Sequence, residues 1–170
     1  MVGNDSTRLT LKSEFFHKVE ALGLRRTLFP SQEEPVDALV QQLELINPIP
    51  HPLQPNHLPS LLGRWQLVYA SQGTVVTRWF TSIPDWSEGI NIKQVWQTLK
   101  AVSNQKIAVE NGAVVDFPLL GEWYLGADGV WTSGANEQVA TVTFSTFSFQ
   151  ATKPFGQERE NLDKVKTDIV

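Results

Sequence analysis

A proline-rich connector divides this chain of 170 residues into two parts with different hydrophobic periods. Five prolines fall between Pro48 and Pro59. The connector therefore cannot form a central strand, because proline lacks the N–H that a sheet ladder requires. Before it, apolar residues recur at a helical spacing, whereas from Gly63 onward they alternate with polar ones. The chain is predicted to fold as two helices followed by a β structure.

The residues before the connector carry two amphipathic helical patterns. The first covers residues 6–22 and ends at Gly23. The second begins at a capping box, Ser31–Glu34, whose serine oxygen accepts a hydrogen bond from the amide three residues later, and it ends at Asn47. The two predicted apolar faces comprise Leu11, Phe15, Val19 and Leu22, and then Val36, Leu39, Val40, Leu43 and Ile46.

The residues after the connector carry the pattern of many short strands. Apolar side chains that alternate with polar ones are typical of a strand with one buried face. About seven to nine such segments at near-even spacing favour a barrel or a sandwich. The predicted strands cover residues 63–69, 75–80, 90–99, 106–109, 113–119, 121–125, 130–132, 138–144 and 146–150.

Three local signals subdivide this β region. Glu110-Asn111-Gly112 predicts a hairpin turn, because Asn-Gly tolerates the positive φ that tight turns require. Residues 126–129 carry glycine at both ends and predict another turn. Between Phe144 and Phe147 the apolar phase slips, which indicates a β-bulge or a tight bend.

Composition excludes several classes of function. The chain has no cysteine, so it forms no disulfide and has no thiolate nucleophile or ligand. Its net charge of −4 argues against nucleic acid as a partner. We expect no metal site, because His51 and His57 lie in the connector without further ligands nearby, and no cofactor, because no phosphate-binding or catalytic motif is present. Without a signal-peptide pattern or a long apolar run, the chain is expected to be cytoplasmic or membrane-peripheral, neither secreted nor membrane-spanning.

The whole chain, residues 1–170, is expected to form one domain. Its predicted parts are a helical region at residues 6–47, a β-barrel at 61–151 and a charged tail at 152–170 that is either a frayed extension or a short helix.

The connector and the first strand together resemble the opening signature of the plastid lipid-associated protein family, also called PAP/fibrillin. In that signature Asn-Pro-x-Pro precedes Leu-x-Gly-x-Trp and an apolar strand. The resemblance extends over roughly residues 8–150, and segments 95–99 and 109–112 match more loosely. The matching residues are Asn47, Pro48, Pro50, Leu61, Gly63, Trp65, Leu67, Tyr69 and Ser71.

The resemblance implies a mainly β fold, a lipocalin-like antiparallel β-barrel preceded by two N-terminal α-helices. It also implies association with thylakoid or plastoglobule lipid in a photosynthetic cell. Gly63 and Trp65 match the lipocalin Gly-x-Trp, in which the tryptophan plugs the closed end of the barrel and glycine lets the backbone pass close by. The final strand pair of the family, with its Arg-Gly motif, is not recognisable. The barrel is therefore expected to be incomplete or open, to close differently, or to be completed by a partner chain in a homodimer.

The leading hypothesis is non-enzymatic binding of a small hydrophobic molecule, such as a lipid, an isoprenoid, a quinone or a pigment. The polar residues Arg78 and Gln97 are candidate anchors for a ligand headgroup if they face the cavity. Each aromatic candidate has an alternative role as ordinary core. The residues expected to line the interior are Tyr69, Trp79, Trp96, Phe117 and Trp123.

Two other functions stay open at this point. One is a structural or interaction protein whose barrel is filled with side chains. The other is a chromophore-handling lipocalin-like enzyme, which requires a buried acid or base, and Asp116 and Glu122 are the candidates. Asp116 stands where the family tends to have asparagine, so a polar contact carried over from that position is in doubt.

Overall fold

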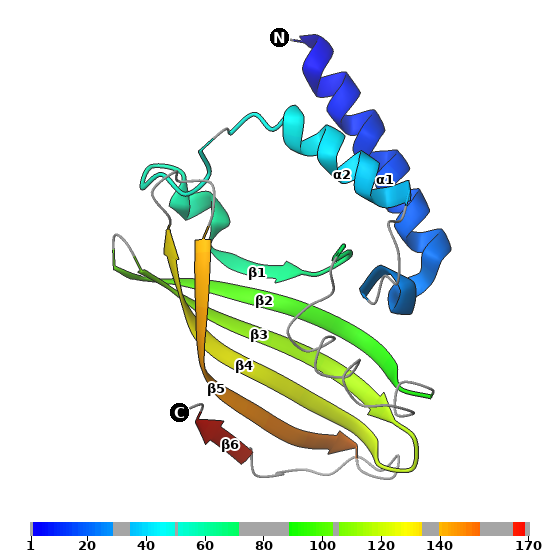
Figure 1. The fold of residues 1–170 in the computed structure, drawn as a ribbon, viewed down its shortest axis with the longest axis vertical. Helices are drawn as coiled ribbons and strands as arrows, with labels where there is room; N and C mark the ends of the chain where they lie inside the picture. Colours follow the sequence, from blue (N-terminus) through cyan, green and yellow to red (C-terminus); the bar gives the residue numbers. More distant parts are fainter. Residues whose placement is uncertain are drawn as a thin grey trace. The chain divides into compact units, whose positions relative to one another are not determined.

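The computed structural model describes residues 2–28, 35–49, 51–71, 89–103, 106–133, 140–153 and 165–168. The chain divides into two compact units. The first comprises Met1–Pro48 and Val68–Ser87 and contains the two α-helices. The second comprises Ile49–Leu67 and Glu88–Val170 and contains the sheet (Figure 1).

Two helices, α1 (Val2–Leu28) and α2 (Pro35–Leu45), form the described core of the first unit. Both predicted helices are confirmed. Gly23 has φ 74° and ψ 157°, so it interrupts α1 where the pattern predicted an end, but the chain resumes a helical path up to Leu28. The capping box lies outside the described residues.

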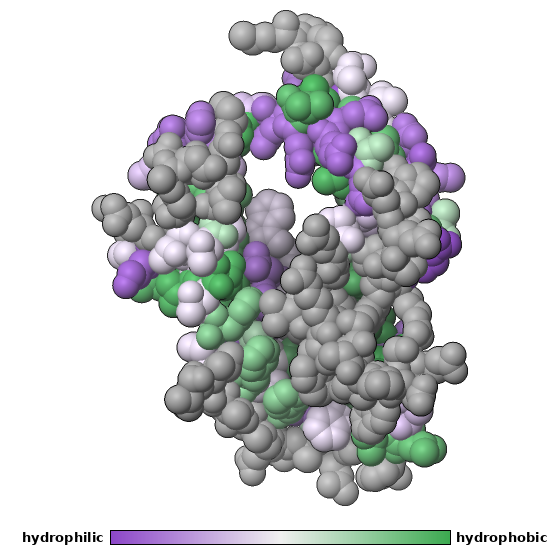
Figure 2. All heavy atoms as spheres, in the orientation of Figure 1, coloured by the Kyte–Doolittle hydropathy of each residue, from purple (hydrophilic) through white to green (hydrophobic). Residues whose placement is uncertain are grey.

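The apolar faces of the helices supply the buried residues of this unit. Leu28 and Val36 are fully buried, and Leu39 is nearly so. The buried Thr27 accepts a hydrogen bond from the Ala70 N–H at 2.9 Å through its carbonyl oxygen, which ties the segment at Ala70 to the end of α1 within this unit. Hydrophilic side chains predominate over α1 and α2 on the face drawn in Figure 2.

The described residues of the second unit form a six-stranded antiparallel sheet in which each strand pairs with its neighbours in sequence. A short 3-10 helix, η1 (Leu58–Leu61), leads into the first strand. Figure 1 shows the long strands curving together. The strands are β1 (Gly63–Gln66), β2 (Asn91–Ser103), β3 (Lys106–Phe117), β4 (Gly121–Ser133), β5 (Ala140–Lys153) and β6 (Val165–Asp168).

The described strands form an open sheet, with β1 and β6 at the two ends of the strand order. The fold is therefore mainly β and lipocalin-like, open rather than closed over the residues described, with helices at its N-terminus. The tail was expected to be frayed or helical, which is wrong for Val165–Asp168, because this segment is a strand that pairs with Thr146–Phe149. The predicted strand 75–80 lies outside the described residues.

Two predicted turns are wrong, because β3 and β4 run straight through them. Glu110-Asn111-Gly112 lies inside β3 and residues 126–129 lie inside β4. Their glycines accommodate neighbouring side chains: a Cβ on Gly112 would lie 2.4 Å from the Trp96 ring, and one on Gly126 would lie 2.4 Å from Ser148 Oγ. A glycine inside a strand often marks such a close approach.

The predicted irregularity between Phe144 and Phe147 is confirmed as a β-bulge. Asp128 pairs with Thr146 while the next residue, Gly129, pairs with Phe144, so Ser145 is an extra residue in β5. The two short strands predicted on either side of the slip are therefore one strand of 14 residues. The bulge returns Phe144 to the face that carries Phe147, because an unbulged ladder would place them on opposite faces.

The pairing registers divide the sheet into two faces, since residues directly opposite each other point to the same side. We call one the apolar face; its buried members are Ile92, Val95, Leu99, Ile107, Val109, Ala113, Val115, Leu125 and Ala127. We call the other the polar face; its members include Arg64, Thr98, Lys100, Glu110, Asp116, Glu122, Tyr124, Asp128 and Ser148, with Trp96 among them.

The 3-10 helix packs on one end of the apolar face. Leu58, Leu61 and Leu62 contact a buried cluster of Leu99, Ile107 and Val109, together with Trp131 and Val142. Full burial of a leucine side chain contributes on the order of 2 kcal/mol, and each of these leucines, being only partly buried, contributes a fraction of that.

Gly112→Ala tests the explanation of the glycine inside β3. The added methyl group would overlap the Trp96 indole, so we expect the variant to lose about 1–3 kcal/mol of unfolding free energy in urea titrations. In a Trp96→Leu background the same substitution should cost much less, because the clashing ring is gone. Equal costs in both backgrounds would contradict the packing explanation.

Candidate functional site

Three of the predicted ligand-binding residues lie on the apolar face, in different rows of the sheet. Gln97 pairs across the strands with Asn111, Trp123 pairs with Val115, and Phe117 pairs with Gly121. All three predicted side chains are partly buried. The register therefore places a polar residue and two aromatic residues on one side of the sheet, as the ligand-binding hypothesis requires.

Gln97 forms a carboxamide pair in the apolar face. Its Nε2 donates a hydrogen bond of 2.9 Å to Asn111 Oδ1 on the neighbouring strand. Each carboxamide has a donor and an acceptor group. The hydrogen bond between them uses one donor and one acceptor. The other polar atoms of the two carboxamides could contact a ligand carbonyl or hydroxyl. Asn111 was expected in a turn, so sequence reasoning missed it as a site residue.

Further aromatic residues of β4 and β5 share this face. Phe144 stands opposite Gly129 and Phe147 stands opposite Ala127, so each ring faces a small neighbour across the ladder. Trp131 and Phe149 complete the group, and all four are only partly buried. Sequence reasoning missed them because it placed a turn in β4 and split β5. The residue spacing alone did not fix which face they occupy.

Trp65 lies on the apolar face, since it pairs with Gln97. The expectation that the ring would be enclosed is wrong: 50% of Trp65 is exposed. Its indole N–H donates a hydrogen bond of 2.7 Å to the carbonyl oxygen of Leu61 at the end of η1. The described contacts thus tie the ring to the helix that covers this end of the sheet. Its role as the base of a barrel stays a prediction.

Gly63 precedes this tryptophan in a conformation that favours glycine. Its φ is 119°, which residues with a side chain rarely adopt. The expectation that glycine serves a close backbone approach is not met, because nothing lies within 4 Å of a Cβ built at this position. Glycine is favoured here because the backbone at the start of β1 adopts a positive φ.

Trp96 lies on the polar face, opposite in direction to its neighbour Gln97. It is 9% exposed, the Arg64 guanidinium stands 4.2 Å from its ring centre, and the Tyr124 ring lies 5.8 Å away. Burial and the nearby Glu110 carboxylate raise the pKa of Tyr124 to about 12, so its hydroxyl stays protonated. Because the register directs Trp96 to the polar face, it cannot line the same face as Trp123.

Of the remaining predicted residues, the structure describes Tyr69 alone. Tyr69 belongs to the first unit, where its ring packs edge-on against Phe15 with centres 6.3 Å apart and its hydroxyl donates to the Asp37 carboxylate. Arg78 and Trp79 lie outside the described residues. Their roles in ligand binding stay predictions.

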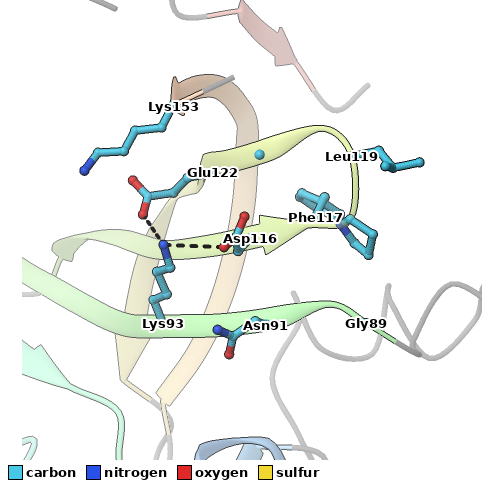
Figure 3. Close-up of a pocket in the computed structure, with 10 residues that line it drawn as sticks. Gly89, Asn91, Lys93, Asp116, Phe117, Leu119, Glu122 and Lys153 are labelled. Carbon is cyan, nitrogen blue, oxygen red and sulfur yellow. Dashed lines mark hydrogen bonds and ion pairs between the residues drawn. The ribbon is translucent and has the colours of Figure 1, made fainter. Parts of the chain in front are cut away.

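A pocket of about 600 Å³ opens at the end of the sheet where β3 turns into β4 (Figure 3). It combines charged side chains with an apolar rim. The lining residues are Gly89, Asn91, Lys93, Asp116, Phe117, Pro118, Leu119, Gly121, Glu122 and Lys153.

Two β-bulges build the polar centre of this pocket. Lys93 is the extra residue in β2 and Thr152 is the extra residue in β5. Both reach Glu122: Lys93 Nζ lies 2.6 Å from Oε2, and Thr152 Oγ1 donates to Oε1 at 2.9 Å. Lys93 also lies 3.6 Å from Asp116 Oδ2, so it bridges the two carboxylates, as Figure 3 shows. Bulges often re-aim side chains in this way.

The ion pair sets the protonation of Glu122. The hydrogen bond from Lys93 lowers the pKa of this carboxyl, partial burial opposes the shift, and the hydrogen bond from Thr152 adds to it. The same contact with Glu122 raises the pKa of Lys93. Glu122 is thus a charged carboxylate at neutral pH and a poor proton donor, which weakens the enzymatic alternative that named it with Asp116.

The described residues contain neither a cluster of metal ligands nor a membrane-spanning helix. No group of three or more histidine, aspartate or glutamate side chains in the described ranges converges as a metal site would require. None of the helices in the described part of the chain is long and apolar enough to cross a membrane.

These observations define the class: a mainly β protein with an open, lipocalin-like antiparallel sheet, one apolar face rich in aromatic residues and helices at its N-terminus. The PAP/fibrillin family model matches residues 10–149, so the chain belongs to the PAP/fibrillin family of plastid lipid-associated proteins. No curated protein and no solved structure matched the chain.

Glu122→Gln tests the ion pair. Because the pKa of Glu122 is lowered on folding, its charge stabilises the protein above the ordinary carboxyl range, and this contribution is lost as pH falls through the lowered pKa. We expect the variant to unfold at a lower urea concentration than wild type at neutral pH, with the difference vanishing in acid. Glu20→Gln, at an exposed position of α1, is the control. A difference that persists in acid would assign the effect to packing instead.

Proposed function

We propose that this protein binds a small hydrophobic molecule, such as a lipid, an isoprenoid, a quinone or a pigment, against the apolar face of its sheet. The observation that carries the proposal is the group of partly buried aromatic residues on that face beside the Gln97–Asn111 pair. Ligand sites are typically apolar with a few placed polar groups, which matches this composition. Membership of a lipid-associated family supports the same class of ligand.

The binding energy in this proposal comes from removing apolar surface from water. Burying a large apolar group contributes on the order of 2–3 kcal/mol, so contacts with several aromatic side chains give useful affinity without an ion pair. The carboxamide pair orients a carbonyl or hydroxyl of the ligand. The process needs no proton transfer or covalent step, so the protein acts as a binder and not as an enzyme.

We further propose that the protein works at the surface of thylakoid or plastoglobule-type lipid, from which a hydrophobic ligand is supplied. The family membership supports this location.

The experiment is a titration of the purified full chain with a short-chain quinone, followed by quenching of tryptophan fluorescence. Phe147→Ala removes a ring from the apolar face and should raise the dissociation constant about tenfold, which corresponds to about 1.4 kcal/mol. Thr143→Ala, on the polar face of the same strand, should bind as wild type does.

Near-ultraviolet circular dichroism of each variant establishes that the fold is retained. Wild-type affinity in Phe147→Ala, or an equal loss in Thr143→Ala, would contradict binding on the apolar face. A wild-type protein that takes up no quinone, carotenoid or lipid would contradict the proposed function as a whole.

A second candidate function is pairing with another chain through an edge of the sheet. Among the described strands, β1 pairs with only Trp96–Leu99 of β2, which has 13 residues. An incompletely paired edge can accept a strand from a second copy. A native mass measurement reports both the oligomeric state and the mass of any bound small molecule. A dimer without bound small molecules favours the scaffold role, and a monomer with added mass favours ligand binding.

A further inference from the structure

The turn between β3 and β4 presents leucines to solvent. Leu119 is 91% exposed and Leu120 is 42% exposed. Figure 2 shows hydrophobic side chains at the surface where Figure 1 places this turn. In Figure 3 Leu119 points away from the charged residues of the neighbouring pocket. Single exposed leucines are common on proteins, so exposure alone does not indicate a binding role.

The backbone of the turn makes this exposure unusual. Leu119 has a φ of 66°, and it is the only residue other than glycine with a positive φ in the described part of the chain. Such a conformation costs a leucine about 1 kcal/mol, whereas glycine or asparagine adopts it readily. The turn therefore holds a large apolar side chain outward at a position where a small or polar residue would be more stable.

Local hydrogen bonds make the turn a rigid element. The Leu120 N–H donates to the Phe117 carbonyl at 3.2 Å, and the Trp123 indole N–H donates to the Leu120 carbonyl at 3.2 Å. The leucines are thus held at the end of β3 and β4, which pair from Lys106↔Thr132 to Phe117↔Gly121. A rigid apolar projection loses little conformational entropy when it enters an apolar phase.

The pocket beside the turn is balanced in charge. Lys93 and Lys153 oppose Asp116 and Glu122, two cations against two anions among its lining residues. An anionic phosphate entering it would meet the two carboxylates, and a cation would have to compete with Lys93, which already bridges them. Carboxylates only accept hydrogen bonds and ammonium groups only donate them. A neutral hydroxyl group can do both, so it can bind to the lysines and to the carboxylates of this pocket.

We propose that the Pro118–Leu120 turn enters the surface of a lipid assembly and that the adjoining pocket takes a neutral, hydroxyl-rich head group, such as the sugar of a glycolipid. The leucines contact the acyl region while Lys93, Asp116 and Glu122 lie at the level of the head groups. This inference rests on the lipid-surface part of the proposed function, and it is independent of the ligand on the apolar face.

The test is flotation of the full chain with three kinds of vesicle: phosphatidylcholine alone, phosphatidylcholine with digalactosyldiacylglycerol, and phosphatidylcholine with phosphatidylglycerol. Wild type should bind the galactolipid vesicles most tightly. Leu119→Asn should fold with equal or greater stability, since asparagine tolerates the positive φ, and yet bind every vesicle about tenfold more weakly.

The matched control is Leu45→Asn, the same substitution at a leucine that is 86% exposed in α2, and it should bind as wild type does. Lys93→Gln should lose the preference for galactolipid while keeping the binding to phosphatidylcholine. A structural role of Leu119 would not raise stability and lower binding together.

Five results would overturn the inference. Unchanged flotation of Leu119→Asn, or an equal loss in Leu45→Asn, would remove the turn from the lipid contact. Preference for the anionic vesicles, or a retained galactolipid preference in Lys93→Gln, would overturn the assignment of the pocket. If wild type binds no vesicle, the lipid-surface part of the proposed function fails too, whereas quinone binding to the apolar face is decided by its own titration.

Discussion

The alternation of side chains across the four long strands β2–β5 is the constraint on which the second unit depends. These strands have 12 to 14 residues each and pair over nearly their whole lengths. Because each residue points to the side opposite its neighbour, the registers collect the apolar residues on one face and the charges on the other. The ligand face, the covering 3-10 helix and the charged pocket all follow from this separation.

Much of the architecture could be predicted from the sequence. The change of period at the proline-rich connector gave the order of helices and strands, and the phase slip between Phe144 and Phe147 located a bulge. The two false turns have a common physical cause. In a turn, glycine is favoured because its backbone can adopt a positive φ. Inside a strand, it is favoured because the missing side chain leaves room for a neighbour, such as Trp96 beside Gly112. The local sequence does not distinguish the two cases, because it does not show where that neighbour lies.

The candidate sites were less predictable, because they depend on register. Gln97, Trp123 and Trp96 were all predicted from the sequence as ligand-binding residues. The sequence could not show that Gln97 and Trp123 share one face of the sheet while Trp96 lies on the other. The pairing of Lys93 with Glu122, 29 residues apart, requires a bulge in β2 that leaves no clear trace in the local pattern. Asp116 and Glu122 were named as candidates for acid–base chemistry, yet the lysine between them gives them the character of a fixed ionic cluster.

The bulge at Ser145 also bears on how the length of this chain can vary. Without Ser145, Phe144 and Thr146 would be consecutive and would still meet Gly129 and Asp128, their present partners. Loss of this one residue would therefore leave every aromatic ring of β5 on the face of the sheet that it occupies now. A residue inserted elsewhere in the strand would instead move every side chain beyond that point to the opposite face. Natural variants with one residue fewer at this position are the ones that the fold should tolerate best.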